Sequence, residues 1–167
     1  MKQKIFQGTA ASLCVGLLVA LLLFALVFDI KNTESAKRSL EQTASAMALR
    51  YTPTEDADAA ARAFSNAAKG LRVTIIAADG TVLGDSETDY KTMENHAQRE
   101  EIKAAQAARV GISVRASATL SQKMIYAAVR TQNGDYVRTA GVYGGFLQSV
   151  TMLLPWLFVA AGIALFM

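Results

Sequence analysis

Cysteine, histidine and proline are scarce in this chain of 167 residues, which contains one Cys, one His and two Pro. The cysteine, Cys14, lies in an apolar run, so the central region holds neither a disulfide nor a cysteine-based metal site. His96 is the single imidazole, and the sequence shows no nucleophile elbow, phosphate-binding glycine loop or His/Cys cluster. The charge excess is only +3, without a basic patch. We therefore expect no enzymatic activity of this chain and no nucleic-acid partner.

Apolar residues are concentrated at the two ends of the chain. Residues 9–28 carry no charge and are long enough to cross a bilayer, which predicts a cytoplasmic tip and first transmembrane helix over 1–28. A cleaved secretory signal is the alternative, because Lys2 and Lys4 precede the run. The run exceeds the about 7–15 apolar residues of a signal peptide, and Phe28-Asp29-Ile30-Lys31 follows it without a small-residue cleavage site.

Residues 146–167 predict a second transmembrane helix in which the chain is truncated, with a buried core helix as the weaker alternative. Pro155 falls inside this segment and would kink it. Together the two apolar segments predict a multi-pass location in the cell membrane. The count of Lys and Arg beside the segments does not decide which side the central domain faces.

The central region, 29–145, has the size of one domain. Its first part, 29–51, lacks Gly and Pro and is predicted to be a juxtamembrane signalling helix. Leu40, Ala44, Met47 and Tyr51 form its apolar stripe, which would pack on the domain or on a second subunit. A second helix is expected to begin with Thr52 as N-cap and to end at Gly70.

The rest of the domain alternates strands with one helix. Residues 71–77 and 81–83 predict a hairpin, Asn95 is expected to cap a helix over 96–108, and strands are expected over 112–119, 124–131 and 136–143. Asn133-Gly134 is a strong signal for a hairpin between the last two. This order predicts an α+β fold with a five-stranded, mainly antiparallel sheet and a long N-terminal helix.

An ordered set of short segments resembles the extracytoplasmic sensor region of PhoR-like two-component sensor histidine kinases. The segments are Arg72-Val73-Thr74-Ile75-Ile76, Asp79-Gly80-Thr81-Val82-Leu83, Asp85-Ser86, Met93-Glu94-Asn95-His96 and Arg99-Glu100-Glu101-Ile102. The family often has Pro after the arginine, where this chain has Glu100. The resemblance implies a PAS-like or Cache-like domain, extracytoplasmic, between two transmembrane helices.

The resemblance implies the sensor and signalling portion of a histidine kinase, relaying a stimulus to a missing cytoplasmic kinase core. It implies a homodimer, contact with the lipid bilayer, an unidentified ligand or protein partner, and a response regulator acting only through the missing core. This chain would need no cofactor, since ATP and Mg belong to that core. Alternatives are a membrane-anchored interaction module of the cell envelope, or a sensor for a chemoreceptor or diguanylate cyclase.

No ligand can be nominated from these motifs, and no catalytic or metal site is predicted. The family-motif positions that stand as candidate binding residues are Asp85, Ser86, Glu94, Asn95, His96 and Arg99.

Three groups of residues each have a functional interpretation and a purely structural alternative. His96 is either a pH sensor or a residue that shapes a helix start. The acidic stretch from Asp79 to Glu94 is either a Ca²⁺ or Mg²⁺ site or, more commonly, a solvated turn. Arg99, Arg115 and Arg130 either pair with an anionic ligand or are dispersed over a sheet surface.

Overall fold

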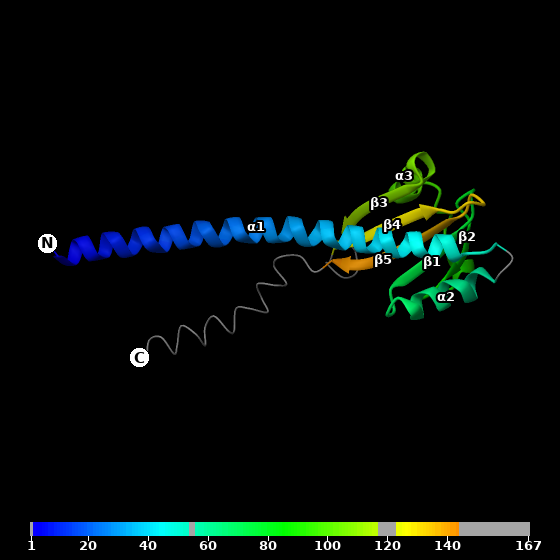
Figure 1. The fold of residues 1–167 in the computed structure, drawn as a ribbon, viewed down its shortest axis with the longest axis horizontal. Helices are drawn as coiled ribbons and strands as arrows, with labels where there is room; N and C mark the ends of the chain where they lie inside the picture. The colour runs from blue at the N-terminus through cyan, green and yellow to red at the C-terminus, as the bar shows by residue number, and fades with distance from the viewer. Residues whose placement is uncertain (1, 54–55, 117–122, 144–167) are drawn as a thin grey trace. The chain divides into compact units, whose positions relative to one another are not determined.

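The computed structural model describes residues 2–53, 56–116 and 123–143. The chain divides into two units, and residues 34–143 form the one that contains the sheet (Figure 1). The predicted boundaries at 28/29 and 145/146 are not tested by this division.

A helix of 49 residues, α1 (Lys2–Arg50), opens the chain. Its last four turns bury the stripe predicted from the sequence: Leu40, Ala44, Met47 and, just beyond the helix, Tyr51 are each 8% exposed or less. The stripe is buried by the chain's own sheet, so its packing on the domain is confirmed.

The predicted multi-pass location in the cell membrane is contradicted. A spanning helix must be both about 20 residues long and predominantly apolar along that length. Among the residues that the structure describes, no helix meets both conditions. The second predicted span, 146–167, lies outside the described residues.

Five antiparallel strands make one sheet in the order β2-β1-β5-β4-β3, so the predicted α+β fold with a five-stranded antiparallel sheet and a long N-terminal helix is confirmed. The strands are β1 (Arg72–Ile76), β2 (Val82–Asp85), β3 (Val110–Ala116), β4 (Lys123–Arg130) and β5 (Tyr136–Tyr143). Two helices, α2 (Ala57–Ala67) and α3 (Glu100–Ala108), and a short 3₁₀ helix, η1 (Tyr90–Thr92), complete the described elements.

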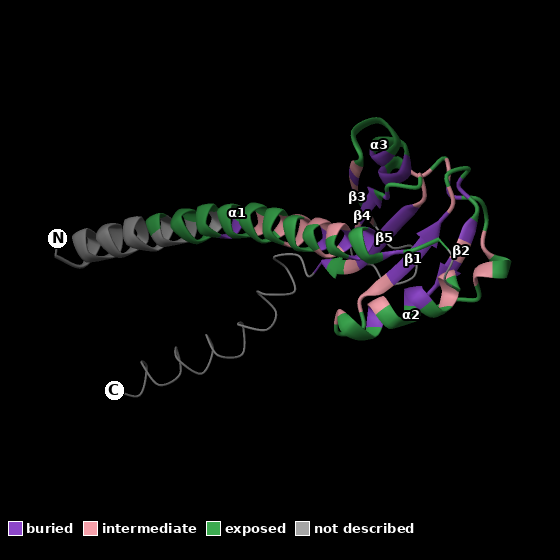
Figure 2. Cartoon of the chain, turned by 45° about the vertical axis from the view of Figure 1, so that its right-hand side comes forward, coloured by how far each residue is buried: buried purple, intermediate pink, exposed green. Residues whose placement is uncertain are grey.

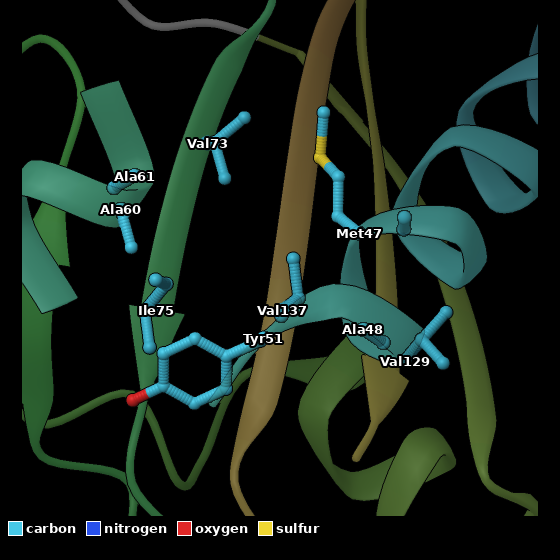
Figure 3. Packing of buried hydrophobic residues seen from close by; sticks show 10 residues of the cluster. Met47, Ala48, Tyr51, Ala60, Ala61, Val73, Ile75, Val129 and Val137 are labelled. Carbon is cyan, nitrogen blue, oxygen red and sulfur yellow. The ribbon is translucent and has the colours of Figure 1, made fainter. Parts of the chain in front are cut away.

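Side chains alternate between the two faces of each strand, and this alternation separates the packing into two layers. On one face Val73, Ile75 and Val137 pack against α1 and α2 (Figure 3). On the other face Ile76 and Tyr136 pack against α3. The sheet, mostly buried in Figure 2, is therefore shared by both layers.

Two predicted helix starts are wrong. The N-cap of α2 is Asp56 rather than Thr52, because the Asp56 carboxylate accepts hydrogen bonds from the backbone N–H groups of residues 58 and 59. Helix α3 begins at Glu100 rather than His96, because the Asn95 side chain accepts from Ala97 N and thereby stabilises a separate turn.

Candidate functional site

Charged and polar side chains gather on the α3 face of the sheet, where an apolar layer is the usual arrangement. Cross-strand pairing places them in adjacent rows, since partners across neighbouring strands point to the same face. One row runs Asp85, Thr74, Arg138, Ala128, Gly111, and the next runs Arg72, Ala140, Tyr126, Ser113. We call the polar cluster formed by Arg72, Thr74, Asp85, Glu101, Ser113, Arg115, Tyr126 and Arg138 the charged network.

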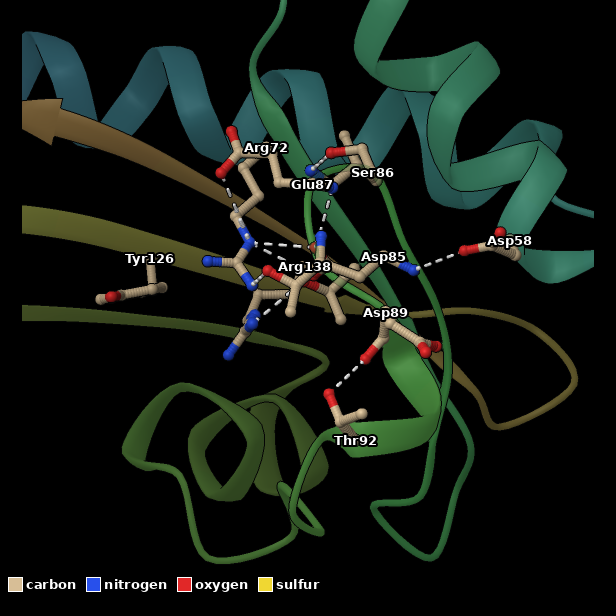
Figure 4. A network of polar contacts seen from close by, with 12 residues as sticks. Asp58, Arg72, Asp85, Ser86, Glu87, Asp89, Thr92, Tyr126 and Arg138 are labelled. Atoms are coloured by element: carbon tan, nitrogen blue, oxygen red, sulfur yellow. Dashed lines mark hydrogen bonds and ion pairs between the residues drawn. The ribbon is translucent and has the colours of Figure 1, made fainter.

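Asp85, at the end of β2, anchors one side of the network (Figure 4). Its carboxylate accepts from Thr74 Oγ1 at 2.7 Å and from Arg72 Nε at 3.2 Å. The backbone N–H groups of Glu87 and Thr88 donate to the same carboxylate, each at 3.0 Å. Burial raises the pKa of Asp85, but these hydrogen bonds to the ionised form outweigh it, so the pKa lies below its ordinary value.

Glu101, in the first turn of α3, anchors the other side. Its carboxylate is fully buried and accepts from Ser113 Oγ at 2.7 Å and from Arg115 Nη2 at 2.8 Å. Arg138 Nη1 donates to the same oxygen over a longer 3.4 Å. Burial raises the pKa of Glu101, but the Ser113 hydrogen bond and the two guanidinium groups outweigh it, so the carboxylate stays ionised.

Arg138, in the middle of β5, connects the two sides. Its side chain is 4% exposed, Nη2 donates to Thr74 Oγ1 at 3.0 Å, and among the residues that the structure describes its Nε has no hydrogen-bond partner. The guanidinium carbon lies 5.4 Å from the centre of the Tyr126 ring, and that of Arg115 lies 4.3 Å from it. Burial lowers the pKa of Arg138. A guanidinium nevertheless remains charged, so this position holds a buried cation with an unused donor.

The candidate residues from the sequence fall into two groups. Asp85 belongs to the charged network, and Ser86 stands beside it, where its Oγ accepts from Val73 N at 3.0 Å. Asn95 instead forms the turn before α3, since its amide donates to Asp79 O at 3.1 Å. Arg99 stands at the N-cap of α3, and its side chain makes no capping hydrogen bond within the described helix.

His96 is 4% exposed, and its Nδ1 donates to the backbone oxygen of Glu94 at 2.6 Å. Burial lowers the pKa of His96, and the nearby charges of Arg138 and Arg99 lower it further. His96 therefore stabilises the turn before α3, and the pH-sensor hypothesis stays a prediction.

The three arginines nominated as an anion site do not converge. Arg115 belongs to the charged network, whereas Arg130 lies at the far end of β4 beside Arg109, in a separate hollow of about 640 Å³. Three residues of the network, Glu101, Arg138 and Thr74, were not among the candidate site residues that the sequence motifs indicated, although Thr74 and Glu101 lie within those motifs. A charged residue at an alternating position inside an apolar strand, as Arg138 is, was the signal available.

Carboxylates of the acidic stretch from Asp79 to Glu94 accept hydrogen bonds from nearby backbone N–H groups, and they do not gather around a common point where an ion could sit. Asp79 Oδ1 accepts from Thr81 N, and Asp89 Oδ1 accepts from Lys91 N. Within the described ranges, no three His, Cys, Asp or Glu side chains are placed to hold a metal ion.

Comparison with known proteins assigns no family: neither a family model nor a curated protein matches the chain. Among solved structures, the chain is similar to the Bacillus subtilis YkuI protein, which has an EAL domain and was crystallised with its substrate c-di-GMP and calcium. The TM-score is 0.47 at 10% sequence identity, over 75% of this chain and 36% of that one. The chain thus spans about a third of that protein, and a likeness this low assigns neither fold family nor activity.

Proposed function

We propose that residues 34–143 are a PAS-like sensor domain of a two-component sensor histidine kinase, and that α1 is the helix through which the domain passes its state to the kinase. The crossover helix α3 between β2 and β3, and the five strands around it, follow the element order of a PAS-like fold. In this proposal ATP and Mg bind only the kinase core, which acts as a homodimer and phosphorylates a response regulator.

One observation carries the proposal: neighbouring residues on β5 contact the charged network and the signalling helix. Arg138 points into the network, and Thr139 points to the opposite face, where its hydroxyl donates to the backbone oxygen of Leu40 in α1 at 3.2 Å. A change at Arg138 that shifts β5 therefore acts directly on α1.

The rest of the contact between α1 and the sheet is apolar and close. Leu40 packs with Ile125, Ala127 and Tyr143, all 5% exposed or less, and Ala44 is fully buried. Interiors packed in this way change between discrete arrangements rather than deforming continuously, which suits a two-state signal. A stimulus must bind the two arrangements with different free energies in order to shift their populations.

The proposal is tested by autophosphorylation of the complete protein that contains this chain, assayed with labelled ATP. Thr139→Val removes the hydroxyl that bonds α1 and should alter the phosphorylation level, whereas Leu40→Pro, which breaks the helix, should abolish its response to a stimulus. Thr43→Val is the matched control, because the Thr43 hydroxyl donates to the Ser39 oxygen of its own helix at 2.8 Å and makes no other hydrogen bond to a described residue.

Absence of phosphate incorporation by the complete protein contradicts the kinase assignment. It would favour an interaction module that holds a partner without signalling, or a sensor joined to a different output. An unchanged response in Leu40→Pro contradicts the role of α1, whatever the output is.

A further inference from the structure

Strand β3 forms one outer edge of the sheet, since β4 pairs with it on one side and no described strand pairs with it on the other (Figure 1). Arg130 N donates to Arg109 O at 2.8 Å, which fixes the phase of the hydrogen-bond ladder. In an antiparallel pair, the backbone groups of alternate residues point away from the partner strand. The N–H and C=O groups of Val110, Ile112 and Val114 therefore point to the open side of β3.

The open edge of β3 is long and regular. Its seven residues, Val110–Ala116, all pair with β4 without a register shift, and the strand contains no Pro or Lys. No described residue bonds the outward N–H and C=O groups of Ile112 and Val114. Native sheets usually blunt such an edge with short strands, bulges, Pro or Lys, because it is a template for a further strand. Strand β3 keeps this template open.

The opposite edge of the sheet, β2, is protected in three ways. Strand β2 has only four residues, and its pairing with β1 shifts register part-way along. Helix α2 also covers it: Asp85 N donates to Asp58 Oδ1 at 3.3 Å, and a Cβ on Gly84 would lie 2.5 Å from the Ala57 backbone. Strand β3, in contrast, is neither short nor irregular, and its Val114 is 39% exposed although it is apolar. The edge of β3 is therefore the one that suits a further strand.

We propose that the open edge of β3 binds an extended acidic segment of a partner protein, which adds a further antiparallel strand to the five-stranded sheet. In this mode of recognition, main-chain hydrogen bonds supply the affinity and alternate side chains supply the specificity. The inference goes beyond the proposed sensor function and does not depend on it, since no step of it involves α1 or a kinase.

The side chains of β3 determine which residues suit each position of the added strand. Val110 and Ile112 are half-buried on the face that packs against α1, and Val114 is exposed on the same face. Apolar residues of the partner would cover these three side chains. On the α3 face the strand presents Arg115, whose side chain is 28% exposed and suits an acidic residue opposite it. Since successive side chains alternate between the two faces, the segment should alternate apolar and acidic residues.

The charge around β3 favours an acidic partner. Residues 99–116, which span α3 and β3, contain four basic and two acidic residues. Of the two acids, Glu101 is buried and already paired with two arginines, so Glu100 is the one that is exposed. Arg109 and Arg130, at the start of β3 and the end of β4, are exposed and make no ion pair with a described residue. A second copy of the chain would bring the same positive excess to the edge, which disfavours it as the occupant.

The test uses the complete 167-residue chain and a fluorescein-labelled peptide of alternating apolar and acidic residues, SVEIEVES, with SVKIKVKS as the matched basic peptide. Fluorescence anisotropy should show saturable binding of the acidic peptide and about tenfold weaker binding of the basic one, because like charges repel across the edge. Amide hydrogen exchange locates the site. The N–H groups of Ile112 and Val114 should exchange fast in the free chain and slowly in the complex, whereas those of Gly111 and Ser113, which face β4, should be slow in both.

Two substitutions at one position separate edge pairing from folding. Val114→Pro removes an outward N–H and leaves the ladder to β4 intact, so the chain should still unfold cooperatively in urea while its affinity for SVEIEVES falls about tenfold. Val114→Thr keeps the N–H and a β-branched side chain, and it should bind like the wild type. Arg109→Gln should weaken binding about two- to fivefold, as expected for the loss of an exposed ion pair, and Arg62→Gln, on α2, should leave it unchanged.

The proposal is overturned if SVKIKVKS binds as tightly as SVEIEVES, if Val114→Pro folds and binds like the wild type, or if the Ile112 and Val114 amides exchange slowly in the free chain. Absence of any anisotropy change at millimolar peptide overturns it as well, and that outcome does not depend on the folding of a variant. Light scattering tests the other occupant. A dimer of the free chain that Val114→Pro dissociates would assign the edge to a second copy and contradict the acidic partner.

Discussion

Asp85 is the residue whose replacement tests the buried charge arrangement most directly. Its carboxylate is 1% exposed and accepts from Thr74, Arg72 and the backbone N–H groups of Glu87 and Thr88. In Asp85→Asn one oxygen becomes an NH₂ group that faces donors. Thr74 Oγ1 already accepts from Arg138, so it can accept from this NH₂ group only with its second lone pair and only if its hydroxyl hydrogen, which now bonds Asp85, turns elsewhere. Breaking one partner of a buried ion pair costs about 3–5 kcal/mol, and we expect about 3 kcal/mol here because Arg72 keeps contact with Thr88 and Glu87.

The measurement is urea unfolding of the complete chain, followed by the near-ultraviolet signal of tyrosine, since all five tyrosines lie in the sheet unit. Asp79→Asn is the matched control: Asp79 is exposed, and an asparagine oxygen can still accept from Thr81 N, so its midpoint should not move. Because the native pKa of Asp85 is lowered, its stabilisation is present above the ordinary Asp pKa of about 3.9 and disappears as the pH falls through the native pKa. The buried charge pairing of Asp85 is contradicted if Asp85→Asn lowers the free energy of unfolding by less than about 1 kcal/mol at pH 7, or if it lowers it by the same amount at pH 2 as at pH 7.

Two further outcomes follow from α3 and the turn before it. Gly111→Ala should destabilise the domain by about 1–3 kcal/mol in the same assay, because a Cβ there would overlap the Glu101 backbone oxygen. Gly141→Ala should cost less, because its Cβ would meet flexible methyl groups of Leu40 at 3.3 Å and 3.4 Å and of Leu71 at 3.5 Å. Equal losses of stability in the two variants would show that α3 is not packed so closely. The native pKa of His96 is lowered, so the unfolded chain binds its proton first: stability should fall as the pH drops below about 6.5 and level off below the native pKa. His96→Gln should lack this slope, and a slope identical to that of the wild type would assign the pH dependence to other groups.

Short-range sequence patterns predicted most helices, strands and turns well, because helical spacing and turn conformation depend on residues close together in the sequence. The stripe of Leu40, Ala44, Met47 and Tyr51 is fixed by helical spacing, and it is buried as expected. Asp79-Gly80 and Asn133-Gly134 form turns in which the glycines have φ of 90° and 99°, conformations that glycine adopts without steric cost. The two misplaced helix starts had competing caps within a few residues, and only side-chain geometry decides between Thr52 and Asp56.

The candidate site was predicted only in part. Asp85 was singled out and does bind the network, but the motif residues Asn95 and Arg99 shape the turn before α3 instead. Arg115, Arg99 and Arg130 were grouped by residue type, and the strand positions separate them. Glu101 stood in the sequence only within the motif segment Arg99-Glu100-Glu101-Ile102, which gave no hint of its burial between two arginines.

Periodicity and turns depend on residues a few positions apart, so the order of the helices and strands and the α+β class could be predicted from the sequence, whereas two helix starts could not. Tertiary structure alone decided the charged network: Arg138 meets Thr74 across 64 residues and Glu101 across 37, and strand order and register set those distances. The same register makes Thr139, the next residue, bond Leu40 across 99 residues on the opposite face. An arginine in a strand is visible in the sequence, but its partners depend on which strands lie beside it.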